Sequence, residues 1–197
     1  MGKGELTRQV ILDEAVRVAS QVGLGGLTIG TLATQTDLSK SGLFAHFKSK
    51  ESLQEQVLAH TIERFIELVV RPALAAPRGE PRVRQLFESW LSWGRDALPG
   101  GCLFFHAALE LDDQPGSARA RLVTHYRDWL DTIAQVFRTG IAEGHFRPDA
   151  DADQFAQDLH GILLAYSLTS RLLEDAAAES RTRRAFEALL ADASQSN

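Results

Sequence analysis

The hydrophobic positions of this chain recur every three or four residues along almost its whole length. This spacing places apolar side chains on one face of a helix, so it predicts helices rather than strands. Short segments with glycine, proline or aspartate interrupt the pattern and mark connections. The sequence therefore predicts an all-α protein of about nine helices, with expected ranges 7–22, 28–36, 39–47, 49–70, 82–97, 102–111, 117–143, 152–174 and 178–193.

Residues 28–47 predict two short helices joined by a tight turn. Thr28 and Ser39 are residue types that cap helix N-termini, and each precedes apolar residues at helical spacing. Asp37 suits the turn between the helices, because aspartate tolerates turn geometry. Leu43 and Phe47 are four residues apart and therefore share one face. This is the arrangement of a helix-turn-helix motif, whose second helix enters the major groove of DNA.

The polar residues of the second helix have the chemistry of a DNA-contacting face. Lys40 and Ser41 can donate hydrogen bonds to base edges, and Gly42 lets the backbone approach the duplex. A three-helix packing unit without a DNA role has similar spacing, but the Lys-Ser-Gly tip and the His-Phe end favour DNA. The residues predicted to bind DNA are Thr28, Ser39, Lys40, Ser41, Gly42, Phe44, His46 and Lys50, the last two at phosphates.

Residues from about 7 to 60 resemble the DNA-binding domain of the TetR (tetracycline-repressor-like) transcription regulators. The matching positions include Leu27-Thr28, Leu38-Ser39, the run from Leu43 to Phe47, and Lys50-Glu51. The resemblance implies three N-terminal helices that bind DNA and a fourth that connects. It also implies about five further helices that form a dimerising, ligand-sensing domain.

Two positions depart from the family pattern. Asp37 stands where the family usually has a glycine in the turn, and Phe44 stands where it usually has a tyrosine after leucine. Phe44 lacks the hydroxyl group that such regulators offer to a phosphate, but its ring can still contact a sugar edge or a thymine methyl group. Because one lost hydrogen bond costs roughly 1 kcal/mol, the resemblance still implies DNA binding.

Charge is distributed unevenly along the 197 residues. The first 50 residues hold six Lys or Arg against four Asp or Glu, a balance of +2, whereas the whole chain carries −5. A basic end on an acidic body suits a protein that touches DNA with one end only. The sequence thus predicts a helix-turn-helix domain at residues 5–50, with its motif at about 28–47. The resemblance implies that residues 51–197 form a helical effector-binding and dimerisation domain.

The middle helices concentrate large aromatic and aliphatic side chains, including all three tryptophans. Such residues fill a core or line an apolar pocket with a few polar groups. By resemblance, a small apolar or amphipathic effector binds here. The predicted lining is Trp90, Trp93, Cys102, Phe105, His106, Leu109, Tyr126, Trp129 and Ile133. His106 and Glu110 lie four residues apart without a third metal ligand, so they predict a polar pocket edge.

The last two predicted helices carry a broad apolar stripe. Its members are Phe155, Leu159, Ile162, Tyr166, Leu173, Phe186 and Leu190. Two such helix pairs can form a four-helix bundle across a two-fold axis, although the stripe can also pack within its own subunit. A helix-turn-helix reader usually needs two half-sites, so we predict a homodimer on a near-palindromic double-stranded operator.

The remaining features exclude several other classes. No glycine-rich phosphate loop, nucleophile elbow, metal-ligand set or cofactor motif is present. The single cysteine, Cys102, suits a cytoplasmic protein, and no apolar run approaches the roughly 20 residues of a membrane span. We predict a ligand-released repressor that is not an enzyme. An effector-independent or activating regulator, and an enzyme that uses the aromatic pocket, are the alternatives.

Overall fold

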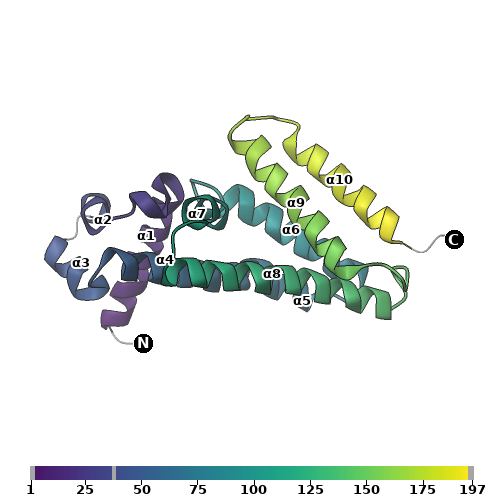
Figure 1. The fold of residues 1–197 in the computed structure, drawn as a ribbon, viewed down its shortest axis with the longest axis horizontal. Helices are drawn as coiled ribbons and strands as arrows, with labels where there is room; N and C mark the ends of the chain where they lie inside the picture. The colour runs from purple at the N-terminus through teal and green to yellow at the C-terminus, as the bar shows by residue number, and fades with distance from the viewer. Residues whose placement is uncertain (1–2, 37–38, 195–197) are drawn as a thin grey trace. The chain divides into compact units, whose positions relative to one another are not determined.

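The computed structural model describes residues 3–36 and 39–194, and its named elements are all helices (Figure 1). The α4, η1 and α5 stretches follow one another without a break in numbering. The described residues therefore form nine continuous helical stretches, which confirms the all-α prediction. The elements are α1 (Lys3–Gly26), α2 (Ile29–Thr36), α3 (Lys40–Phe47), α4 (Lys50–Phe65), the π-helical η1 (Ile66–Val70), α5 (Arg71–Ala75), α6 (Glu80–Asp96), α7 (Leu103–Leu111), α8 (Ser117–Ala142), α9 (Ala152–Arg171) and α10 (Ala178–Ala193).

The chain forms two compact units that do not follow a simple linear division. Unit 1 consists of Met1–Phe65 and Arg95–His125, and unit 2 consists of Ile66–Gly94 and Tyr126–Asn197. Helix α7 and the start of α8 thus group with the N-terminal helices. The predicted division at residue 50 concerns function and stays a prediction.

Unit 1 is built around α1, which packs against α2, α4 and α7. The loop that follows α6 lies tightly on α1, because a Cβ atom at Gly100 would come 1.6 Å from the Ser20 carbonyl oxygen. The Gly100 N–H donates to Ser20 Oγ at 3.1 Å. The Pro99-Gly100-Gly101 turn before α7 therefore requires glycine at this close approach.

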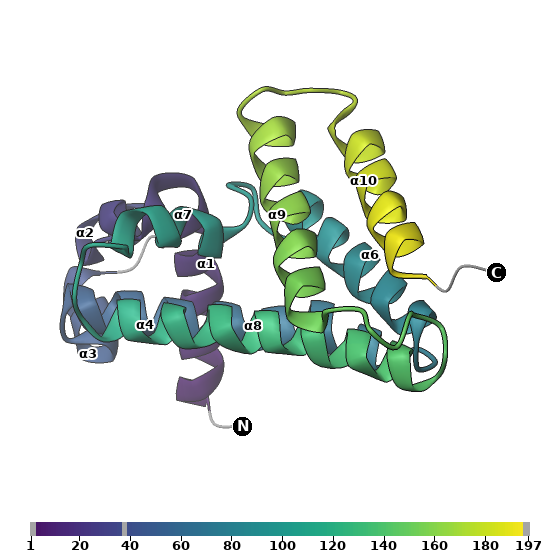
Figure 2. The same ribbon diagram turned by 45° about the vertical axis from the view of Figure 1, so that its right-hand side comes forward.

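Unit 2 is held together by aromatic stacking. Phe87 of α6 and Phe186 of α10 stack with their ring centroids 3.9 Å apart. Phe137 of α8 stacks on Phe146 and on Phe155 of α9, at 4.4 and 4.0 Å. Figure 2 shows α9 and α10 side by side, in agreement with their many mutual contacts. These rings supply a large buried apolar area, which makes them the centre of this unit.

Four side chains flank the Phe87–Phe186 stack as two ion pairs between α6 and α10. Arg84 donates to both carboxylate oxygens of Glu187, at 2.5 and 3.0 Å, and Arg183 donates to both oxygens of Glu88. These hydrogen bonds raise the pKa of both guanidinium groups above its ordinary value. We call these two pairs and the two stacked rings the α6–α10 clasp.

The predicted end of the fourth helix at residue 70 is wrong. Helical structure continues through the π-helical η1 and α5 to Ala75. Pro72 lies in the first turn of α5, where a missing backbone N–H costs little. The π-helical stretch resets the hydrogen-bond register just before the proline, so the chain remains helical instead of ending there.

None of the helices in the described parts of the chain combines the length and apolarity needed to cross a membrane.

Candidate nucleic-acid interface

Helix α2 begins with a reciprocal pair of caps. Thr28 Oγ1 accepts the Thr31 N–H at 3.0 Å, and Thr31 Oγ1 accepts the Thr28 N–H at 2.8 Å. Two of the backbone donors that a helix N-terminus leaves without partners are thereby satisfied. Ile29 and Leu32 are buried, as the spacing predicted. The predicted N-cap at Thr28 is confirmed.

Helix α3 begins in the same way and turns its apolar side inward. Ser39 Oγ accepts the Gly42 N–H at 3.1 Å, which confirms the second predicted cap. Leu43 and Phe47 are fully buried. Because these two residues fix the rotation of the helix, the positions on its opposite side face outward. Asp37, which was predicted to lie in the turn before α3, is outside the described residues, as is Leu38.

The outward side of α3 carries the residues predicted to contact DNA. Lys40, Ser41, Gly42 and Phe44 are exposed, and the Phe44 side chain is 52% exposed. Lys40 makes no ion pair with any residue that the structure describes. His46 is half-buried, with its ring centroid 6.2 Å from that of Phe47. A cation, a hydroxyl group and an exposed ring on one short helix suit contact with bases and phosphates.

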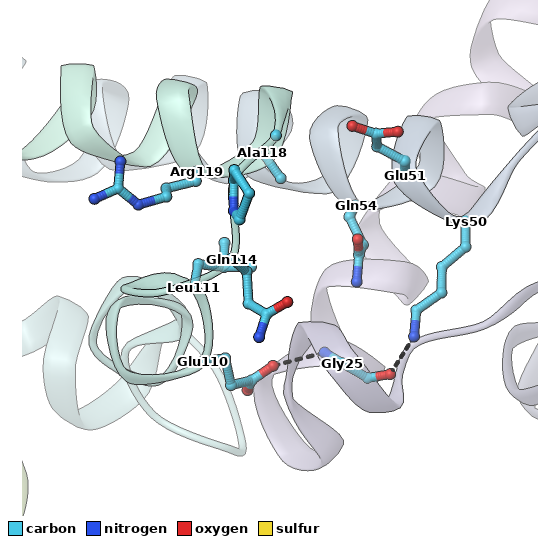
Figure 3. Close-up of a pocket in the computed structure, with 11 residues that line it drawn as sticks. Gly25, Lys50, Glu51, Gln54, Glu110, Leu111, Gln114, Ala118 and Arg119 are labelled. Carbon is cyan, nitrogen blue, oxygen red and sulfur yellow. Dashed lines mark hydrogen bonds between the residues drawn. The ribbon is translucent and has the colours of Figure 1, made fainter.

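The side chain of Lys50, which was predicted to contact a phosphate, has a hydrogen-bond partner inside the protein. Its Nζ donates to the Gly25 carbonyl oxygen at 2.6 Å, inside unit 1. The Gly25 N–H donates to the Glu110 carboxylate, also at 2.6 Å. Figure 3 shows Lys50 and Glu110 on opposite sides of Gly25, beside a cavity of about 460 Å³. Lys50 therefore holds the segment before α2, a role that the sequence did not indicate.

Lys48 and Gln35 were not predicted to contact DNA, although both are exposed, Gln35 within the motif and Lys48 directly after it. Lys48 ends α3 with φ at 60°, and its N–H donates to the Phe44 carbonyl oxygen at 3.0 Å. The distribution of lysine along the sequence could have indicated Lys48 as a DNA contact. All four lysines of the chain fall within residues 3–50, and every later cation is an arginine. Both cations bind phosphate: lysine does so as a compact point charge, whereas the planar fork of arginine also matches the two oxygens of a carboxylate.

The residues predicted to line an effector pocket differ widely in exposure. Trp90, Trp93, Trp129 and Ile133 of unit 2 are buried, whereas Leu109 of unit 1 is 69% exposed. The other four are buried (Cys102) or half-buried: Phe105, His106 and Tyr126. They come from both units, and a pocket among them stays a prediction.

His160 of α9 was not among the predicted pocket residues. Its Nδ1 is buried and has no hydrogen-bond partner among the described residues. Burial lowers the pKa of this imidazole below its ordinary value, so the ring is neutral at pH 7. Its centroid lies 5.6 Å from that of Tyr126, in an edge-to-face arrangement. A buried polar atom of this kind is costly unless something hydrogen-bonds to it.

Most of the predicted dimer stripe is covered within unit 2 itself. The buried members are Phe155, Leu159, Tyr166, Phe186 and Leu190. Two of them have aromatic partners already described, and Tyr166 packs edge-on to Trp90. Ile162 is half-buried and Leu173 is 64% exposed, so only these two present surface to another chain. The stripe thus follows the alternative of packing within its own subunit, and the homodimer stays a prediction.

Two family profiles match the chain. The profile described as "Bacterial regulatory proteins, tetR family" matches residues 11–57, which contain the capped helix pair. The profile described as "Tetracyclin repressor-like, C-terminal domain" matches residues 79–186, more than half of the chain.

Individual relatives agree with these profiles. The HTH-type transcriptional repressor DhaR of Mycobacterium sp. (strain GP1) is 24% identical over 156 residues, which cover 77% of this chain and 76% of DhaR. A TetR transcriptional regulator from Chloroflexus aurantiacus is 28% identical, with a TM-score of 0.85 and coverage of 97% and 96% of the two chains. A TetR-family regulator from Cytophaga hutchinsonii, at 21% identity, shares the fold with a TM-score of 0.86 over 100% and 99%.

Three observations identify the family of this chain. They are the caps and buried residues of α2 and α3, the outward polar face of α3, and the matching family profiles. This chain belongs to the tetR family of bacterial regulatory proteins, and it is a DNA-binding regulator of transcription with an N-terminal helix-turn-helix.

Proposed function

We propose that this protein is a homodimeric transcriptional repressor that binds a near-palindromic operator and leaves it when a small apolar or amphipathic effector binds. The single observation that carries the proposal is the outward side of α3, where Lys40, Ser41 and Phe44 are exposed while Leu43 and Phe47 are fully buried. Repression, rather than activation, is supported by the similarity to a protein described as a transcriptional repressor.

Each exposed residue of the motif has a distinct task in this proposal. Lys40 and Ser41 contact base edges, and the Phe44 ring contacts a sugar or a thymine methyl group. His46 and Lys48 contact phosphates and fix the register. Gly42 allows close approach, and a Cβ atom there would also come 3.1 Å from Ser39 Oγ and disturb the cap. Thr28, Ser39 and Lys50 act by holding the two helices in place.

The effector is proposed to bind in unit 2, among the buried aromatic residues of α6 and α8. Trp90, Trp93 and Trp129 supply an apolar lining, and His160 supplies a buried nitrogen that lacks a hydrogen-bond partner in the described residues. Apolar walls with a few polar groups are the usual composition of a small-molecule site. A neutral ligand that hydrogen-bonds to the neutral His160 ring would satisfy this nitrogen.

The dimer is proposed to form through the outer face of α9 and α10 rather than through the buried stripe. Leu168, Leu172 and Leu173 near the end of α9 are 46%, 73% and 64% exposed. On the same helix, a Cβ atom at Gly161 would meet no atom within 4 Å, so another helix has room to approach there. Exposed leucines gathered at one end of a helix are typical of a surface that a partner covers.

The experiment that tests the proposal is selection of duplexes from a random library by the purified full-length chain, followed by a salt titration. We expect an enriched site with two similar half-sites about one helical turn apart and binding that weakens steeply with salt. Placed across a promoter, this site should give repression in an in vitro transcription assay. Failure to enrich any sequence contradicts DNA reading, and activation from the same site contradicts the repressor assignment alone.

A further inference from the structure

The segment that joins α1 to α2 is held by side chains from two other helices. The α1 backbone departs from helical geometry at Gly23, with φ at 76°, and α1 ends three residues later at Gly26, before α2 begins at Ile29. Gln54 Nε2 donates to the Leu24 carbonyl oxygen at 2.7 Å. Lys50 Nζ and the Glu110 carboxylate bind the carbonyl and the N–H of Gly25. We call these last two hydrogen bonds the Gly25 clamp.

Glu110 fits closely against this backbone. A Cβ atom at Gly23 would come 2.1 Å from Glu110 Oε1, and one at Gly25 would come 3.2 Å from Oε2. The carboxylate therefore occupies a hollow that exists only because glycines line it. A hydrogen bond from a backbone N–H to a carboxylate is shorter and stronger than one between neutral groups, as the 2.6 Å distance indicates.

The Gly25 clamp lies directly before the cap of α2. Thr31 Oγ1, which takes part in that cap, also lies 3.3 Å from the Gly26 carbonyl oxygen, the next residue after Gly25. The orientation of the Gly25 peptide therefore helps to determine where α2 begins. Because α2 packs against α3, a shift of the start of α2 would also change the position of the outward side of α3.

Glu110 connects this segment to a part of the chain that reads no DNA. It is in the last turn of α7, within the residues matched by the C-terminal family profile, whereas Gly25 and Lys50 are matched by the N-terminal profile. The three residues belong to one compact unit. Glu110 itself lines the adjoining cavity of about 460 Å³, so its carboxylate has space beside it.

We propose that Glu110 is a positioning residue for DNA binding, which holds Gly25 so that α2 and α3 keep the orientation that reads the operator. A displacement of α7 withdraws the carboxylate and loosens the start of α2. This inference rests on the proposed function, because it concerns how the same helices are held. It predicts that a negatively charged side chain far along the sequence favours binding to negatively charged DNA.

Two conservative variants separate this role from a simple charge effect. Glu110→Gln keeps the reach and an acceptor oxygen but removes the charge, whereas Glu110→Asp keeps the charge but is one methylene shorter. The proposal expects Glu110→Gln to bind the selected duplex within about threefold of wild type, and Glu110→Asp to bind about tenfold more weakly. Long-range repulsion between the carboxylate and DNA would instead make Glu110→Gln bind more tightly and leave Glu110→Asp unchanged.

Glu63→Gln provides the matched control. Glu63 is exposed on α4 in the same unit, and the substitution removes the same charge as Glu110→Gln. Its affinity should equal or slightly exceed that of wild type. Amide hydrogen exchange on the free protein gives a second measurement. Exchange at Gly25 should accelerate in Glu110→Asp, while amides of α9 and α10 keep the wild-type rate.

Wild-type affinity together with wild-type Gly25 exchange in Glu110→Asp would overturn the inference, as would equal weakening in both variants. If the wild-type chain selects no DNA, the proposed function fails. The exchange rates then still decide whether Glu110 holds Gly25.

Discussion

The outward side of α3 and the α6–α10 clasp both combine charged side chains with aromatic rings, yet the two are built differently. In the clasp, Arg84 and Arg183 each bind a carboxylate across the helix pair, and the rings of Phe87 and Phe186 are buried against each other. On α3, Lys40 has no ion-pair partner among the described residues and the Phe44 ring is half exposed. Side chains that partner one another hold a fold together, whereas those without partners are available to a ligand.

The largest expected effect comes from removing a stacked ring of the clasp. Phe186→Ala should lower the free energy of unfolding by about 3–5 kcal/mol, because it leaves a cavity beside Phe87. Phe44→Ala, the matched change on α3, should alter it by no more than about 0.5 kcal/mol, since that ring is already in water. Urea unfolding followed by circular dichroism measures both. If the two variants lost equal free energy of unfolding, the two rings would contribute equally to stability, and the contrast between the two regions would be wrong.

The second expected effect is on DNA affinity. Lys40→Ala should weaken binding to the selected duplex by about 1–3 kcal/mol without changing the urea midpoint, because the lysine has no internal role. If Lys40 also contacts a phosphate, the slope of log affinity against log salt should fall by about 1 per subunit. Arg127→Ala removes an exposed cation from α8 and serves as the control. An unchanged affinity in Lys40→Ala would place the DNA contact elsewhere.

A smaller effect, of opposite sign, is expected at Phe44. Phe44→Tyr adds the hydroxyl group that similar regulators offer to a phosphate, at a ring that is exposed and free of steric hindrance. One new hydrogen bond is worth about 1 kcal/mol, so affinity should rise roughly fivefold. Fluorescence anisotropy with a labelled duplex is sensitive enough to show this. If the affinity falls instead, the ring contacts an apolar group that excludes a hydroxyl.

The smallest expected effect concerns the ion pairs of the clasp. A double-mutant cycle with Arg84→Ala and Glu187→Ala should give a coupling energy of about 0.2–1 kcal/mol, since both side chains remain partly in water. The coupling should shrink in 1 M salt. A coupling well above this range would mean that the charges, rather than the stacked rings, hold α6 to α10.

The local features of the motif could be predicted from the sequence because they depend on neighbours within a few residues. The caps at Thr28 and Ser39 and the burial of Leu43 and Phe47 follow from residue type and helical spacing alone. The same reasoning located the ends of most helices. It failed at Pro72, where a π-helical stretch changed the hydrogen-bond register before the proline.

Contacts between distant segments could not be predicted in this way. Gly25 and Glu110 are 85 positions apart, and nothing in either local pattern shows that one binds the other. The sequence shows Lys50 as a lysine near the motif, but it does not show that its Nζ donates to the Gly25 carbonyl oxygen, 25 positions away. The predicted phosphate contact of Lys50 stays a prediction. The apolar stripe on α9 and α10 showed that these helices bury one face. Its sequence could not show whether that face packs within the same subunit or against a second one, which depends on the position of α6.

The confinement of lysine to residues 3–50 has a practical consequence for anyone who handles this protein. Reagents that react with side-chain amines can modify only this N-terminal stretch. Coupling the protein to a sensor surface through those amines would attach it by the helices that read DNA and hide them. Attaching the duplex instead leaves the protein unmodified, and protection of Lys40 and Lys48 from an amine reagent would then report operator occupancy directly.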